Sequence, residues 1–268
     1  MTLNASEQRY SRPDVPRDDR PIRVGSLLFT LVQPRPGHEV AFNRWYERDH
    51  FYAGCMIGAH QFAGSRYVAT RDCKALRYGT DNPGDIDRTS GAYLAVYWVL
   101  DGAHDDWNRW GVDQVNNLHA GQRMFAERDH IHTGLYRYLA EYNAPGSSMP
   151  VELALDRHYG GVIAALGQLA PSVTNDDVRA FHAGRPCPSD VMLLADPVPM
   201  LADRPGDVPA SEGVHVLQLF FSIEDPRSVW DRYRTLGADF AAAGLGTISF
   251  ASPFLSTIPG TDTYTDQL

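Results

Sequence analysis

The chain has 268 residues, of which 43% are hydrophobic, and this is enough to bury a substantial core as one large domain or two smaller ones. Its formal net charge is -9, with 24 Lys and Arg against 33 Asp and Glu, which excludes the basic face that phosphate backbones require. The composition therefore favours a small-molecule ligand and argues against nucleic acid as a partner.

Residues 1–21 mix arginine, aspartate and proline without a helical or strand period, so we expect an extended N-terminal arm there. The arm has no apolar run of signal-peptide length, and no segment of the chain approaches the roughly 18 consecutive apolar residues of a membrane helix. The three cysteines, Cys55, Cys73 and Cys187, are odd in number and widely spaced, which suits reduced thiols. We therefore expect a cytoplasmic protein that does not enter a membrane.

The stretch 22–143 has the predicted element order of a ferredoxin-like unit. In chain order we expect strand 23–32, helix 38–53 ending at Gly54, strand 58–70, a long loop 71–91, strand 92–100, helix 101–125 and strand 131–142. Strand 92–100 (AYLAVYWVL) is apolar on both faces, which is typical of a central strand covered from both sides. The order is βαββαβ.

A second, degenerate copy of this order follows the linker-like stretch 144–158. In 159–268 we expect strand 160–170, helix 174–184, strands 189–196 and 214–223, helix 226–243 and strand 247–256. Each unit would leave one apolar sheet face bare, and facing the two bare faces would bury both. The predicted fold class is therefore α+β, with two tandem ferredoxin-like units packed sheet to sheet as a barrel within one chain.

The first helix carries the strongest candidate for chemistry. Phe42, Tyr46 and His50 are spaced by four, so on an α-helix they share one face. Histidine titrates near pH 6.5 and can move a proton at neutral pH. The alternative interpretation of His50 is a packing or capping residue at a helix end, and that of Tyr46 is half-buried packing.

The strand 58–70 places His60, Phe62 and Arg66 on one face. An arginine in this position could hold an enolate, phenolate or carboxylate through its planar guanidinium, although many such arginines only reach the surface. Trp98, on the apolar strand, is a further candidate for the wall of a ligand pocket, with core packing as the alternative. His60 likewise has a structural alternative.

A second group of titratable residues lies before the last strand of the first unit. His130 and His132 are two apart, so on a regular strand they point to one face, a spacing used by metal sites. Glu127 or Asp129 could add an oxygen ligand. The alternative is a pair of solvated histidines at a strand entrance, and the leading prediction includes no metal.

The pattern Phe42-x-x-Trp45-Tyr46-x-x-x-His50, between an apolar strand and a strand rich in Gly and Arg, resembles the dimeric α/β-barrel superfamily and, within it, the EthD-like branch. This resemblance implies ferredoxin-like units paired into a barrel, with a pocket between sheet and helices. Members include cofactor-free monooxygenases, polyketide cyclases and dehydratases, lyases and isomerases, and a haem-binding group. Helix 174–182 lacks the pattern, so we expect one site per chain; EthD-like proteins commonly dimerise, and a homodimer of the fused chain stays open.

We therefore predict a cofactor-independent acid/base enzyme, a dehydratase, cyclase, isomerase or lyase, acting on a small apolar molecule of aromatic or polyketide-like character. No nucleotide-binding, serine-hydrolase or zinc-protease motif is present in the sequence. His50 would move the proton and Tyr46 and Arg66 would position a ligand oxygen. Phe42, His60, Phe62 and Trp98 would contact the ligand. The alternatives are a cofactor-free monooxygenase on a phenolic substrate, a metal-dependent enzyme using His130 and His132, and a non-catalytic binding protein.

Overall fold

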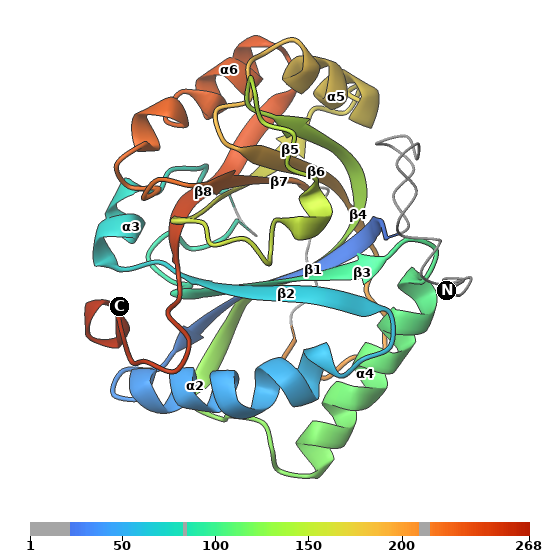
Figure 1. Ribbon diagram of the computed structural model, residues 1–268, viewed down its shortest axis with the longest axis vertical. Coiled ribbons are helices and arrows are strands. Elements are labelled where there is room, and N and C mark those ends of the chain that lie inside the picture. The colour runs from blue at the N-terminus through green and yellow to red at the C-terminus, as the bar shows by residue number, and fades with distance from the viewer. Residues whose placement is uncertain (1–21, 83–84, 209–214) are drawn as a thin grey trace, which may run out of the picture.

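Eight antiparallel strands close into one barrel in the order β1-β3-β2-β8-β5-β7-β6-β4 (Figure 1). The computed structural model describes residues 22–82, 85–208 and 215–268, so the expected arm 1–21 lies outside the described residues. Within each half the strands are arranged as in a ferredoxin-like unit, β4-β1-β3-β2 in the first and β8-β5-β7-β6 in the second. The predicted α+β fold class, an intrachain dimeric α/β barrel, is confirmed.

The elements of the first half are β1 (Val24–Pro34), α2 (Glu39–Trp45), the π-helix η1 (Tyr46–Met56), β2 (Gln61–Val68), α3 (Arg71–Leu76), β3 (Tyr93–Leu100), α4 (His104–Ala120) and β4 (Arg128–Asn143). Those of the second half are η2 (Val151–Leu153), β5 (Gly161–Leu169), α5 (Asn175–Ala183), β6 (Val191–Val198), β7 (His215–Ser222), η3 (Trp230–Arg232), α6 (Leu236–Ala242), β8 (Gly246–Ser256) and η4 (Thr265–Gln267). The division into units 22–143 and 159–268 with a linker at 144–158 stays a prediction. Each observed strand overlaps its predicted range, but β1, β4, β6 and β8 extend beyond it by one to three residues.

The two seams that close the barrel differ in length. β4 pairs with β6 from Leu135↔Val198 to Asn143↔Val191, whereas β2 pairs with β8 only at Tyr67↔Ser256 and Val68↔Leu255. One seam therefore supplies most of the backbone hydrogen bonds between the halves, and the inner side chains supply the rest of the attachment.

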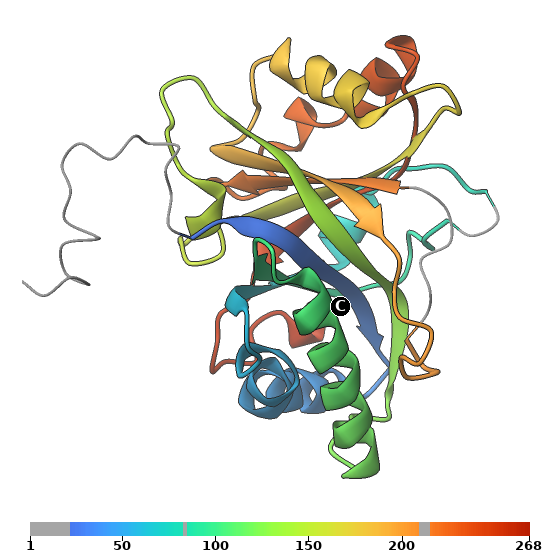
Figure 2. The same cartoon turned by 90° about the vertical axis from the view of Figure 1, so that its right-hand side faces the viewer.

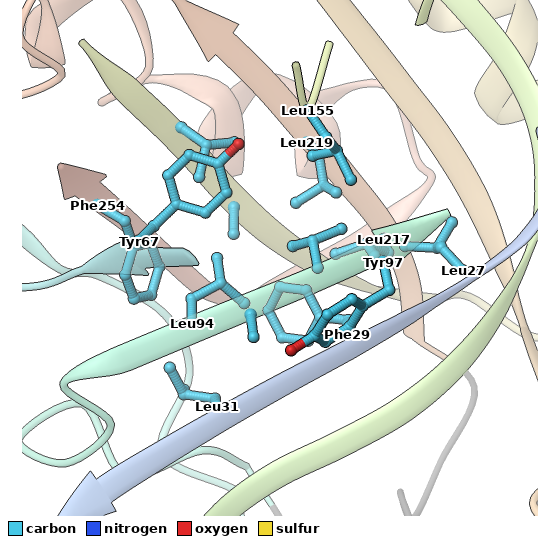
Figure 3. Packing of buried hydrophobic residues seen from close by; sticks show 14 of the residues in the cluster. Leu27, Phe29, Leu31, Tyr67, Leu94, Tyr97, Leu155, Leu217, Leu219 and Phe254 are labelled. Carbon is cyan, nitrogen blue, oxygen red and sulfur yellow. The ribbon is translucent and has the colours of Figure 1, made fainter. Parts of the chain in front are cut away.

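Alternate residues of every strand fill the barrel interior. Leu27, Phe29 and Leu31 of β1 are fully buried and meet Leu94 of β3 and Leu217 of β7 inside the barrel (Figure 3). Burial of each such side chain contributes about 1.5–3 kcal/mol, so this interior is the shared core that holds the halves together. The helices lie outside the barrel, with α2 and α4 below it, α5 and α6 above it, and α3 at the side next to β8 (Figures 1 and 2).

Several boundaries differ from the predicted ones. The first helix does not stop at Gly54 but changes at Tyr46 from an α-helix into a π-helix that runs to Met56. The expected long helix 226–243 is only the 3-10 turn η3 and the short α6, and the expected loop 71–91 contains α3. None of the helices in the described ranges is long and apolar enough to cross a bilayer.

Candidate functional site

A half-open cavity of about 120 Å³ lies between the helices of the first half and the outer face of its sheet. β1 and β4 form its floor with Leu28, Thr30 and Thr133. The π-helix η1 and helix α4 form its walls, with Tyr46 and His50 on η1. The walls are mostly apolar, with a few polar groups, which is the usual character of a small-molecule site.

The π-helix decides where His50 lies. In a π-helix residues five apart stack on one face, whereas in an α-helix residues four apart do so. His50 accordingly stacks on Trp45, with ring centroids 4.6 Å apart and planes 19° apart, and meets the ring of Tyr46 edge-on at 5.1 Å. A side chain at Gly54 would not fit, because a Cβ atom there would lie 2.6 Å from Cε1 of His50.

His50 has an unusual electrostatic state. Its Nδ1 atom is buried and has no hydrogen-bond partner among the residues that the structure describes. Burial, reinforced by the charge of Arg128, lowers the pKa of His50 to about 3, so the imidazole is neutral at neutral pH. A buried nitrogen without a partner costs about 1–3 kcal/mol, and a ligand that bonds to it would recover that cost.

Tyr46 is fixed in the wall by a second tyrosine. Its hydroxyl oxygen lies 2.9 Å from that of Tyr97 on β3, and burial raises the pKa of Tyr46 far above its ordinary value. Cys55, also on η1, lines the same cavity and lies close to Tyr97 behind it, and burial raises the pKa of its thiol to about 12. Both groups therefore stay protonated near neutral pH, and Cys55 has no nucleophilic character.

Arg66 lies behind Tyr46 and is not one of the residues that line the cavity. Its guanidinium carbon is 4.4 Å from the centre of the Tyr46 ring, and Nη1 donates to Oδ1 of Asn43 at 3.2 Å and lies 3.6 Å from a carboxylate oxygen of Glu47. Burial lowers the pKa of Arg66. The arginine supports the ring of Tyr46 from outside the cavity.

The four predicted ligand contacts lie elsewhere. Phe42 is fully buried among the rings of Trp45, Tyr46, Tyr93 and Phe125. His60 is exposed in the turn before β2, with a φ of 72°.

Phe62 and Trp98 point away from the cavity for different reasons. A register shift between Gln61 and Ala63 interrupts the regular alternation at Phe62, which packs against the core. Trp98 points into the barrel, where Nε1 donates to the carbonyl of Val151 at 3.1 Å. Neither side chain lines the cavity.

The expectation that His130 and His132 share a face is wrong because β4 contains a β-bulge. His132 pairs with Leu31 and His130 with Val32, so Ile131 is an extra residue opposite β1 and reverses the alternation. His132 turns into the barrel, where Nε2 lies 3.0 Å from the hydroxyl of Tyr136, while His130 lines the cavity. Consistently, the described part of the chain holds no cluster of three or more His, Cys, Asp or Glu suited to a metal.

The same bulge brings His130 onto the face of Thr133. Nδ1 of His130 lies 3.3 Å from Oγ1 of Thr133, and Nε2 accepts a hydrogen bond of 3.3 Å from Nε of Arg128. Arg128 also pairs with Asp207 at 3.0 Å. Burial, followed by the charge of Arg128, lowers the pKa of His130 to about 4, so this imidazole too is neutral.

The remaining walls were not predicted as site residues. Trp107 and Trp110 on α4 line the cavity, and Nε1 of Trp107 donates to the side-chain oxygen of Gln61 at 3.0 Å. The segment Met200–Val208, which follows β6 of the second half, reaches across to close the cavity of the first. The helical period marked Trp107 as buried, but no sequence pattern links residues 200–208 to a cavity whose other walls lie within residues 28–135.

The second half has a smaller cavity, of about 90 Å³, in the corresponding place between its helices and its sheet. His182, near the end of α5, lines it beside Phe181 and Phe220. Burial lowers the pKa of His182 to about 4, and its buried Nε2 has no hydrogen bond within the described ranges. The rim carries Arg185 and Arg232, each paired with a carboxylate.

Comparison with solved structures shows which proteins have a similar fold. A putative chlorite dismutase shares 9% sequence identity, with 92% of this chain and 100% of that chain covered and a TM-score of 0.51. A variant of DypB from Rhodococcus jostii RHA1, in complex with haem, shares 10% identity, with 90% and 95% covered and a TM-score of 0.52. No protein-family profile and no curated protein sequence matches the chain.

Sequence identities this low carry information on the fold alone. The coverage of nine tenths of this chain extends the similarity to both halves. Together with the strand order, it shows that this chain has the dimeric α/β-barrel fold.

Proposed function

We propose that the chain is an enzyme that performs acid/base chemistry on a small, largely apolar molecule in the first-half cavity, with His50 as the proton-transfer group. The observation that carries this proposal is the buried, unpartnered Nδ1 of a neutral His50 on the wall of an apolar cavity. Among described buried side chains such groups are few, and each calls for a partner.

His50 is suited to begin the reaction as a base. Since its imidazole is neutral at neutral pH, it can accept a proton from a weakly acidic C–H or O–H group of the ligand. The anion formed on the ligand then lies beside the new imidazolium, and this opposite charge raises the pKa of His50 within the complex. Return of the proton to another atom gives isomerisation, and loss of a leaving group gives dehydration or lyase chemistry.

The cavity limits the size of the ligand. An engineered cavity of about 150 Å³ holds benzene, so a half-open cavity of about 120 Å³ suits one small ring that projects partly to solvent. Trp107 and Trp110 provide flat apolar contacts for such a ring. Tyr46, held by Tyr97 and by Arg66 behind it, is a positioning residue in this proposal.

Haem, which one structural neighbour contains, does not fit this cavity. About 120 Å³ is well below the roughly 300–1,000 Å³ of pockets for drug-sized ligands, and a porphyrin is at least of that size class. His50 is also packed against Trp45 and Gly54, which leaves no open slot over its ring for a macrocycle.

We also assign the chain to the EthD-like branch as a proposal, supported by the spacing of Phe42, Trp45, Tyr46 and His50. A fusion of two ancestral units is supported by the matching strand orders of the halves. A homodimer of the fused chain remains a prediction for solution scattering.

The test follows proton transfer directly. A panel of small aryl ketones is incubated with the protein in D₂O, and deuterium incorporation next to the carbonyl is followed by NMR. The wild type should accelerate exchange for at least one compound, and His50→Gln should lose about 10²- to 10⁴-fold of that acceleration while still binding it. Binding is read from tryptophan fluorescence, to which Trp107 and Trp110 in the cavity wall contribute.

Two other outcomes identify the alternatives. Oxygen consumption with a phenolic compound, in place of exchange, would assign a cofactor-free monooxygenase. Binding without exchange or turnover would leave a small-molecule-binding protein. Unchanged exchange in His50→Gln would refute the role given to His50.

A further inference from the structure

Four polar side chains form an unbroken line from the buried Arg128 to the cavity floor. Arg128 donates from Nε to Nε2 of His130 at 3.3 Å, His130 Nδ1 lies 3.3 Å from Oγ1 of Thr133, and that oxygen lies 3.0 Å from Oγ1 of Thr30. Thr30 and Thr133 both line the cavity and are 7% and 5% exposed.

The hydrogen bond from Arg128 to His130 determines which atoms donate in the rest of the line. A guanidinium has only donors, so Nε2 of His130 must accept, and in the neutral imidazole Nδ1 then carries the hydrogen. Nδ1 therefore donates to Thr133, and Thr133 can in turn donate its own hydrogen to Thr30. In that arrangement the hydroxyl hydrogen of Thr30 is free to point into the cavity.

We propose that Thr30 is a ligand-binding donor at the end of a hydrogen-bond chain polarised by Arg128, and that it holds the ligand oxygen on which negative charge develops. The proposal rests on the proposed function, and it narrows the ligand to a ketone, enol or phenol. When His50 takes the proton, the electron pair of the broken C–H or O–H bond moves onto that oxygen, which accepts the hydrogen of Thr30.

Arg128, His130 and Thr133 act as positioning residues. The side chain of Arg128 is 6% exposed, and it is held by Asp207 at 3.0 Å, which also lies 3.2 Å from Nε2 of His119. Each bond in a chain that begins at a cation strengthens the next one, so the charge acts on the ligand without touching it. Asp207 belongs to the segment that crosses from the second half.

The other ionisable groups on the cavity wall do not duplicate this donor. Tyr46, His50 and Cys55 come from η1, and all three are uncharged near neutral pH. Arg204 enters from the segment after β6, and it donates to the carbonyls of Val208 and Leu201 at 3.1 and 3.3 Å. Arg204 is thus the other cation that could stabilise a negative charge in the cavity, and Arg204→Met is the control variant for it.

The probe is 4-nitrophenol, whose absorbance reports directly whether the bound molecule is ionised. We expect Thr30→Val, which keeps the shape, to raise the pKa of bound 4-nitrophenol by about one unit or more, a tenfold change in ionisation. Thr30→Ser should keep the wild-type value because it keeps the hydroxyl. Arg128→Met should shift the value in the same direction by less, and Arg128→Lys serves if the methionine variant does not fold.

The outcomes separate this inference from the proposed function. Two results would overturn the hydrogen-bond chain from Arg128 to Thr30: an unchanged pKa of the bound probe in Thr30→Val, or a shift of that pKa in Arg204→Met but not in Arg128→Met. In either case deuterium exchange could still depend on His50. If wild-type protein does not bind 4-nitrophenol at all, the ligand class is wrong. If Thr30→Val changes the pKa of the bound probe but His50→Gln leaves exchange unchanged, the role of Thr30 is supported and the role of His50 is refuted.

Discussion

Each half of the barrel carries a histidine on its first helix with a buried ring nitrogen, His50 within η1 and His182 near the end of α5, but in different surroundings. In the first half a π-helix stacks His50 on Trp45 beside a mostly apolar cavity. In the second half the regular helix α5 places His182 among Phe181, Phe220 and Tyr142, with ion-paired arginines at the rim.

The comparison shows that two halves with the same strand order can have cavities with different walls. The backbone repeat alone produces a cavity between helices and sheet in each half. The features that favour chemistry, a π-helix, a β-bulge at Ile131 and a segment borrowed from the other half, all occur at the first cavity. Paired substitutions in the two halves test this difference.

The largest expected difference is in catalysis. His50→Gln should reduce deuterium exchange by about 10²- to 10⁴-fold, whereas His182→Gln should leave it within about twofold. Exchange is measured by NMR on both variants at equal folded concentration. Equal losses in the two variants would show that the halves do not differ in the way proposed.

A glycine in each half gives a matched test of packing. Gly54→Ala should cost about 1–3 kcal/mol of unfolding free energy, since the added carbon would meet the ring of His50 at 2.6 Å. Gly184→Ala should stay within about 0.5 kcal/mol, because its φ is -80° and the nearest atom, the carbonyl oxygen of Ala180, is 3.4 Å away. Urea unfolding measures both; a neutral Gly54→Ala would mean that His50 moves freely.

His50 and His182 should also differ in how they make the unfolding free energy depend on pH, although this difference is smaller than the two above. The pKa of His50 is lowered from 6.5 to about 3, so as the pH falls below 6.5 the unfolded chain binds this proton first. Its part of the stability is complete above about pH 6.5 and is lost toward pH 3, by up to about 1.4 kcal/mol per pH unit.

His50→Gln should therefore flatten the curve of unfolding free energy between these pH values. His182→Gln should flatten it over a narrower window, since the pKa of His182 falls only to about 4. Urea titrations at each pH compare both variants with the wild type, so that the shared carboxylate titrations cancel. A steeper acid loss in His50→Gln would contradict the neutral imidazole.

The smallest expected effect is at His60. Because this residue is exposed in a turn away from the cavity, His60→Ala should change ligand binding and exchange by less than about twofold. Titration of Trp fluorescence with the exchanging compound provides the measurement. A large loss of affinity would restore His60 to the site.

The fold was largely predictable because it depends on local patterns. Apolar runs such as AYLAVYWVL, the Gly and Pro breaks between them and the order of helical and strand periods recur twice, and each is a property of consecutive residues. The same reasoning placed Tyr46 and His50 together, and both line the cavity, since both lie on one helix. It failed at Phe62, His132 and Trp98, where the face depends on a bulge or on which side of the sheet becomes the barrel interior.

The amino-acid sequence by itself therefore determined the order of helices and strands, its repetition in the two halves and the helix that carries His50, because hydrophobic period and turn chemistry act over a few residues. The tertiary structure alone decided that η1 is a π-helix, that Ile131 bulges so that His130 joins Thr133 and Thr30, and that residues 200–208 close the cavity. These features depend on contacts between segments up to about two thirds of the chain apart, and no local pattern encodes such contacts.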